Sequence, residues 1–151
     1  MNRLYSALAV LACLAAMAAG AQAPEEQEQP GPAPAPEDAQ VYLIAPSGGA
    51  ATLGAITVVI GLRGMGIAPA GVRHENTGHF HLVVDGEPPP PGEPIPEDDR
   101  HIHLDGGETQ TMLELEPGSH TVQVIFADHR HIPHEPPLMS EKVTFEVLQV
   151  Q

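Results

Sequence analysis

Histidine is the residue type in this chain whose spacing most clearly suits chemistry. Nine histidines occur in 151 residues. Six of them form His-x-His pairs at residues 79–81, 101–103 and 129–131, and another follows at position 134. Residues i and i+2 of a β-strand lie on one face, roughly 6.5–7 Å apart, so two imidazoles of such a pair can reach one ion. The pattern therefore predicts a metal site.

The predicted ligand pool contains every histidine of these three groups. Its members are His79, His81, His101, His103, His129, His131 and His134. Seven imidazoles exceed one coordination sphere, so we expect either outer ligands or two ions. Asp128 is the expected residue that orients a ligand through the second nitrogen of its ring. His120 follows a Pro-Gly turn, and we interpret it as a structural residue that bonds backbone near that turn.

The donor chemistry favours copper first and zinc second. Imidazole suits both metals, and Cu(II) stands highest in the affinity order of divalent ions. The single cysteine, Cys13, lies in a predicted leader, so no thiolate is expected at the site. Three alternatives remain open at this stage: a polar hydrogen-bonded cluster, a pH response based on histidine, and chance.

The elements that must position these residues are strands, because the apolar residues alternate with period two. Short runs of this kind are bounded by Gly- and Pro-rich segments, and no window predicts an amphipathic helix. The predicted strands are residues 41–44, 56–62, 78–85, 110–116, 119–127 and 141–150. Six or seven short strands of this spacing predict an all-β fold, an immunoglobulin-like antiparallel β-sandwich of about seven strands. We expect the strands at 78–85 and 119–127 to be neighbours in it.

The N-terminal region has the composition of a leader followed by a spacer. Residues 1–21 combine Arg3, an uncharged apolar run and a small-residue cleavage site, which is typical of a secretory signal peptide. The sequence around Cys13 also fits a lipoprotein signal. Residues 22–39 are rich in Pro, Glu and Ala, and we expect a disordered acidic linker. The predicted His-rich domain is residues 40–151.

Charge and composition exclude several classes of partner. The formal net charge is −14 and aromatic residues make up 3%, so nucleic acid and anionic membrane surfaces are not expected partners. No apolar run beyond the leader is long enough to span a membrane. The acidic cluster Glu97-Asp98-Asp99 lacks the spacing of a calcium loop, and we interpret it as solvated surface.

Several sequence blocks together resemble a bacterial family. They are IGLRGMGIAPAG, ENTGHFHLVVD, PIPEDDRHIHLDGG, LELEPGSHTVQV and FADHRHIPHEPPLMS. This combination resembles the domain of unknown function 4399 over about residues 40–150. The resemblance implies a short exported protein with one compact domain, and it implies no activity.

The resulting expectation is an exported, most simply periplasmic, metal-binding module that buffers, delivers or senses copper. An envelope protein is a further expected partner. Two alternatives remain: a metal-dependent enzyme with an open three-histidine site, and a metal-free interaction domain of the cell envelope. The sequence contains no nucleophile elbow and no Ser-His-Asp order, so an enzyme is the less favoured interpretation. A metal-free domain predicts imidazoles scattered over separate surfaces.

Overall fold

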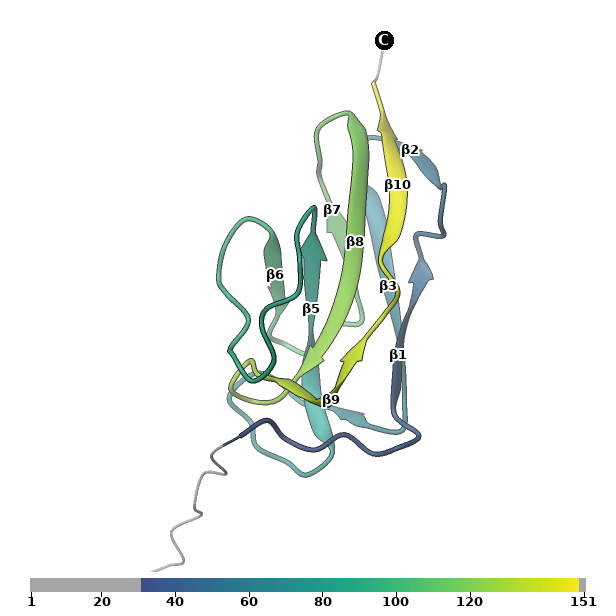
Figure 1. Ribbon diagram of the computed structural model, residues 1–151. Helices are drawn as coiled ribbons and strands as arrows, with labels where there is room; N and C mark the ends of the chain where they lie inside the picture. The colour runs from purple at the N-terminus through teal and green to yellow at the C-terminus, as the bar shows by residue number, and fades with distance from the viewer. Residues whose placement is uncertain (1–30, 150–151) are drawn as a thin grey trace, which may run out of the picture.

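The computed structural model describes residues 31–149, and within this range the chain forms strands and loops only. The predicted signal peptide and residues 22–30 of the predicted linker lie outside the described residues. Two β-sheets pack face to face as a β-sandwich (Figure 1), which confirms the predicted fold class. Residues 31–149 contain no helix of the length and apolarity that crossing a membrane requires.

The two sheets differ in size. The smaller sheet has the order β1-β3-β7, formed by β1 (Gln40–Ala45), β3 (Ile56–Arg63) and β7 (Gln110–Leu113). The larger sheet has the order β2-β10-β8-β5-β4, formed by β2 (Ala51–Leu53), β10 (Val143–Leu148), β8 (Gly118–Ala127), β5 (Thr77–Val84) and β4 (Gly66–Ile67). Two further strands extend it, because β6 (His101–Leu104) pairs with β5 and β9 (Pro133–Met139) pairs with β8.

The pairing departs from the prediction in two respects. Two short strands, β2 and β4, pair in parallel with β10 and β5, so the sandwich is not purely antiparallel. Four strands are not among those predicted: β2, β4, β6 and β9. The first two are too short to show a period, and β9 contains three prolines. Proline has no N–H to donate to a ladder, which is compatible with β9 because it joins the sheet only through β8.

The N-terminal segment, residues 31–39, also differs from expectation. The sequence predicts that it belongs to the disordered linker, but it lies along the other side of β9. The N–H of Glu135 donates to the carbonyl of Ala33, and the N–H of Ala35 donates to the carbonyl of Glu135, each at 2.9 Å. The composition of this segment does not reveal these bonds, because they use backbone groups alone.

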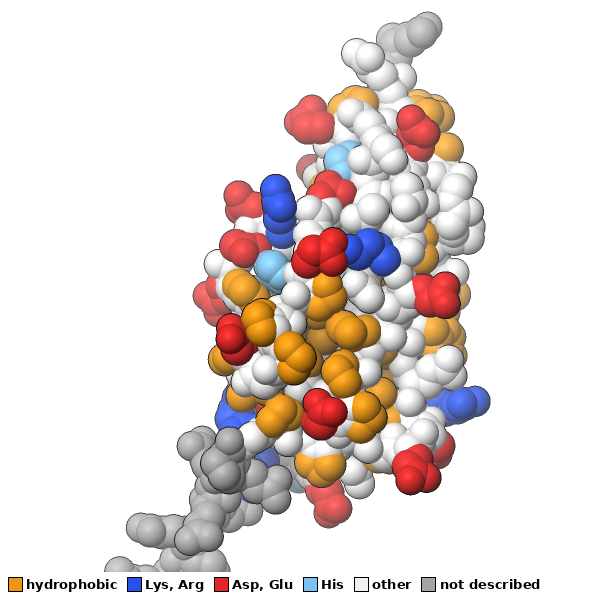
Figure 2. Space-filling view, in the orientation of Figure 1, with side chains coloured by type: hydrophobic (Ala, Val, Ile, Leu, Met, Phe, Trp, Pro, Cys, Tyr) orange, Lys and Arg blue, Asp and Glu red, His pale blue; other side chains and the backbone are white. Residues whose placement is uncertain are grey.

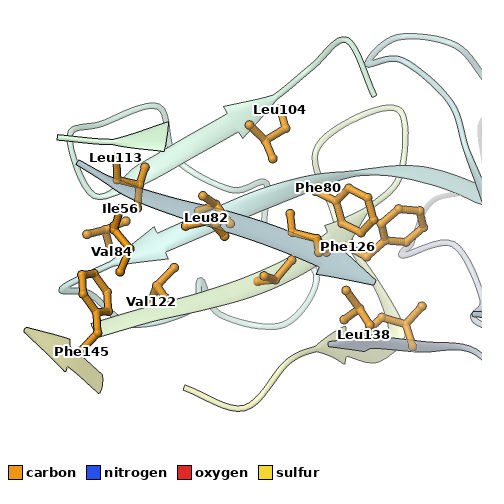
Figure 3. Close-up of a cluster of buried hydrophobic side chains, with 14 of the residues drawn as sticks. Ile56, Phe80, Leu82, Val84, Leu104, Leu113, Val122, Phe126, Leu138 and Phe145 are labelled. Carbon is orange, nitrogen blue, oxygen red and sulfur yellow. The ribbon is translucent and has the colours of Figure 1, made fainter. Parts of the chain in front are cut away.

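The core lies between the two sheets and follows directly from the alternation of β5 and β8. Phe80, Leu82 and Val84 point inward from β5 and meet residues such as Val122 and Phe126 from β8 (Figure 3). The rings of Phe80 and Phe126 lie 5.0 Å apart. Burying a side chain of this size stabilises the fold by about 1.5–3 kcal/mol. The side chains of His79 and His81 must therefore project from the opposite face of β5.

His120 and Asp85 join the end of β5 to the start of β8. The His120 Nδ1–H donates to Asp85 Oδ2 at 2.6 Å, and its Nε2–H donates to the Glu116 carbonyl at 2.7 Å. Both ring nitrogens thus face acceptors, which only an imidazolium satisfies. The hydrogen bond to Asp85 accordingly raises the pKa of His120. The contact with Glu116 confirms the structural interpretation of this histidine.

This pair predicts a pH-dependent difference between the wild type and Asp85→Asn, a variant that keeps the acceptor for the Thr121 N–H. A raised His pKa stabilises the fold below the ordinary value of about 6.5, and the contribution disappears as pH rises through the folded-state pKa. The pair is partly exposed, so we expect a difference below about 1 kcal/mol at pH 5–6, shrinking toward pH 9. Urea unfolding of both proteins in EDTA measures it. A difference that stays constant with pH would contradict the assigned charge.

Candidate metal centre

His79 and His81 occupy the outward face of β5, as their alternation with Phe80 and Leu82 requires. Both are nevertheless fully buried, each with 0% exposure. Their rings lie 4.6 Å apart between centroids. Residues 85–100 and the β8–β9 loop help to cover this face, where Ile95 packs in a small cluster with Val83.

His103 comes from β6 and lies directly opposite His81 in the antiparallel register. The ring centroids of the two residues are 4.4 Å apart. The Nε2 atom of His103 lies 2.9 Å from the carbonyl of Pro96, which can only accept, so Nε2 carries the proton. The Nδ1 atom of His103 is then unprotonated, so its electron pair is available to a metal. It has no hydrogen-bond partner among the described residues.

His131 reaches the same place from the β8–β9 loop. Its backbone has φ of 64°, a left-handed conformation that the loop must hold in place. Asp128 provides this restraint, because its Oδ1 accepts the N–H groups of Arg130 (2.8 Å) and Ile132 (3.2 Å). Burial opposes ionisation of Asp128, but hydrogen bonds from the Arg130 side chain and these N–H groups outweigh it and lower its pKa. Asp128 thus organises the loop, whereas the sequence predicts that it orients an imidazole ligand.

Asp105, which directly follows β6, completes the cluster. Its Oδ1 lies 3.7 Å from His79 Nε2, 3.8 Å from His103 Nδ1 and 3.9 Å from His131 Nδ1. Its side chain is 55% exposed, whereas that of His79 is fully buried. The carboxylate therefore lies on the solvent side of a convergent set of ring nitrogens.

Hydrogen bonds among the described residues leave several ring nitrogens of this cluster without a partner. His79 Nε2 and His131 Nδ1 are 3.1 Å apart, which suits either a hydrogen bond or two ligands of one ion. Both ring nitrogens of His81 and the Nδ1 of His79 are buried without a partner. Leaving a buried polar group unpaired costs about 1–3 kcal/mol, so these atoms require an explanation. An ion in this place would account for one nitrogen of each ring that coordinates it, because an imidazole binds an ion through a single nitrogen.

The protonation state also suits coordination. Burial, with repulsion from neighbouring imidazoles, lowers the pKa of His79 to about 4 and that of His81 to about 2. Both rings are therefore neutral at pH 7. A neutral imidazole has the free electron pair that a metal ligand needs.

A match to a known protein family shows to which family the chain belongs. A model for the family described as Domain of unknown function (DUF4399) matches residues 58–148. The chain belongs to this family. No curated protein matches the chain, and no solved structure matches it either. The matched region of the DUF4399 domain contains all five residues of the cluster, while β1 and β2 precede it.

The DUF4399 domain keeps the other three histidines of the predicted pool away from the cluster. His101 uses its two nitrogens on Asp98 (2.7 Å) and on the carbonyl of Glu87 (3.3 Å). His134 is buried, and its ring stacks on that of Phe126. Its Nδ1–H donates to the Phe126 carbonyl at 3.2 Å. His129 lines a separate cavity of about 500 Å³, whose lining also includes Arg73 and Arg130.

Asp105 is the member of the cluster that the sequence analysis missed. The signal for it is the period-two pattern itself, since His101, His103 and Asp105 alternate with Ile102 and Leu104. A carboxylate two residues after a His-x-His pair lies on the same side of an extended chain. The cluster within residues 31–149 that is able to hold a metal thus comprises two overlapping groups, His79/His81/His131 and His103/Asp105/His131.

Proposed function

We propose that this domain is an exported metal-binding module that holds one copper ion, with zinc as the alternative metal. The ligands come from four imidazoles, His79, His81, His103 and His131, together with the Asp105 carboxylate. One observation carries the proposal: His81 is fully buried among three other imidazoles, and neither of its ring nitrogens has a hydrogen-bond partner. The convergence of rings from three segments argues against a metal-free domain with scattered histidines.

The spacing of the donors supports a transition metal. Zinc–nitrogen bonds of about 2.0–2.1 Å place two tetrahedral ligand nitrogens roughly 3.3 Å apart. The 3.1 Å between His79 Nε2 and His131 Nδ1 is close to this value. A set dominated by neutral nitrogen donors suits Cu(II) and Zn(II), whereas Mg²⁺ and Ca²⁺ prefer oxygen. The Irving–Williams order ranks copper above zinc.

The number of protein ligands favours storage, delivery or sensing of the metal over catalysis. A catalytic metal usually keeps three protein ligands and one position for water or substrate, whereas a closed site uses four. Here four imidazoles and one carboxylate form two overlapping groups of three possible ligands that share His131, so an ion within reach of both groups would have more than three protein ligands. The predicted signal peptide supports a location in the periplasm or outside the cell, where we propose that an envelope protein exchanges the ion with this domain.

Calorimetric titration of the metal-free purified chain with Cu²⁺ and Zn²⁺ tests the proposal. We expect one ion per chain with a micromolar or tighter Kd. The double variant His79→Ala/His81→Ala should lose at least about 100-fold in affinity, because it removes two direct ligands, whereas loss of an outer partner alone costs 10–100-fold. The matched control is His74→Ala/His129→Ala, which removes two histidines that line the separate cavity of about 500 Å³. Equal affinity of the wild type and the His79/His81 variant would refute the proposed site.

A further inference from the structure

The buried position of the inner ligands raises the question of how an ion reaches them. His79 and His81 have no exposed surface, whereas Asp105 is half exposed and His103 is 10% exposed. A second cavity, a shallow depression of about 490 Å³ that is wide open to solvent, lies beside His103 and Asp105. Its lining residues are Glu97, Asp98, His101, His103 and Asp105. We call this cavity the acidic mouth.

The acidic mouth has the chemistry of a cation site. Its lining contains three carboxylates and two imidazoles, and no lysine or arginine belongs to it. Figure 2 shows acidic side chains gathered along the margin of the molecule that β6 and its preceding loop occupy in Figure 1. A concave surface of one charge sign raises the local concentration of the opposite ion. The sequence alone indicates only solvated surface for Glu97 and Asp98.

A second feature, independent of the acidic residues, connects the mouth to the inner cluster. The His103 side chain is nine-tenths buried, lines the mouth, and its Nδ1 has no hydrogen-bond partner among the described residues. The same ring lies 4.4 Å from that of His81 and 4.9 Å from that of His131. Asp105 likewise belongs to both places. One imidazole and one carboxylate thus border the mouth on one side and the buried nitrogens on the other.

We infer that the acidic mouth is an outer capture site for the divalent ion, at which Glu97 and Asp98 attract and briefly bind it before His103 and Asp105 pass it inward; His101 supports Asp98 there, because both of its ring nitrogens are engaged with acceptors. This inference rests on the proposed function, because it concerns the filling of the same inner site. Asp98 is fixed for this role, since its Oδ1 accepts the N–H groups of Arg100 (2.9 Å) and His101 (3.0 Å). The carboxylate therefore keeps one position at the rim.

Stopped-flow mixing of the metal-free full chain with Cu²⁺, followed by copper d–d absorption, tests the inference. The variant Glu97→Gln/Asp98→Asn removes two charges from the mouth, and the new amide oxygen at position 98 still accepts from the backbone. The matched control, Glu114→Gln/Glu146→Gln, removes two exposed charges outside the mouth and the inner cluster. At low salt we expect the association rate of the mouth variant to fall by roughly 3- to 10-fold. In about 0.5 M salt, where such fields are screened, the difference should vanish.

The spectrum at saturation separates capture from coordination. Because the inner ligands are intact, the mouth variant should reach the same final spectrum as the wild type. Association as fast as in the control variant would overturn the capture site, and so would an altered final spectrum, which would make Glu97 or Asp98 an inner ligand. The variant His79→Ala/His81→Ala separates the two proposals. If this variant gives the same copper spectrum as the wild type, the inner site is refuted as well. If it loses the spectrum while the mouth variant associates at the normal rate, only the capture site is refuted.

Discussion

Saturating metal should raise the thermal stability of the wild-type chain substantially. The ligands come from β5, from β6 and its end, and from the β8–β9 loop, so the complete site exists only in the folded state. An ion present at a thousand times its Kd then stabilises the fold by about 4.1 kcal/mol. For a domain of this size, that corresponds to a rise in Tm of roughly 12–25 °C.

Thermal unfolding followed by circular dichroism, in EDTA and in excess Zn²⁺, measures this effect. Zinc is the better probe here, because copper binds more strongly to histidines of the unfolded chain and would reduce the difference. The His74→Ala/His129→Ala variant should show the full rise, and the His79→Ala/His81→Ala variant almost none. A rise of the same size in both variants would show that the ion binds elsewhere.

The substitution His81→Leu should stabilise the metal-free chain while abolishing its response to metal. In the absence of an ion, His81 buries two ring nitrogens without partners. An apolar side chain of similar size removes this penalty, so we expect a gain of about 1–2 kcal/mol in the free energy of unfolding. The Zn²⁺-dependent rise in Tm should disappear, because a leucine offers no ligand.

His134→Leu is the matched control for this experiment. His134 is nearly as deeply buried as His81, but its Nδ1–H donates to the Phe126 carbonyl. Its replacement removes that hydrogen bond and should destabilise the fold by about 0.5–1.5 kcal/mol. Urea unfolding in EDTA compares the two variants with the wild type. Destabilisation by both substitutions alike would mean that His81 has a structural role without metal.

The sequence predicted the parts of this molecule that depend on local alternation. Phe80 and Leu82 on one face of β5 and His79 and His81 on the other follow from a period of two. The adjacency of β5 and β8 was also expected and is confirmed by their register. Such features need only the geometry of one strand and a common sandwich arrangement.

The choice among the seven histidines could not be predicted in the same way. His103 joins the cluster because β6 pairs with β5 after the loop of residues 85–100, and that register does not show in the pattern of either segment. His131 joins it because one left-handed residue turns the β8–β9 loop. Its neighbour His129 differs by two positions and faces a different cavity. The pairing of strands in the folded sheet and the backbone angle of one loop residue determine which histidines join the cluster.

The segment at residues 31–39 has a consequence for how copies of this protein meet one another. A strand at the margin of a sheet presents unsatisfied amides and carbonyls that can recruit a strand from another molecule. On β9, Ala33 and Ala35 already engage both backbone groups of Glu135, and Pro136 and Pro137 have no amide hydrogen to offer. The Arg130 side chain fastens the start of the segment through the Gly31 carbonyl at 2.7 Å. The chain thereby caps this margin with its own residues and protects it against edge-to-edge association.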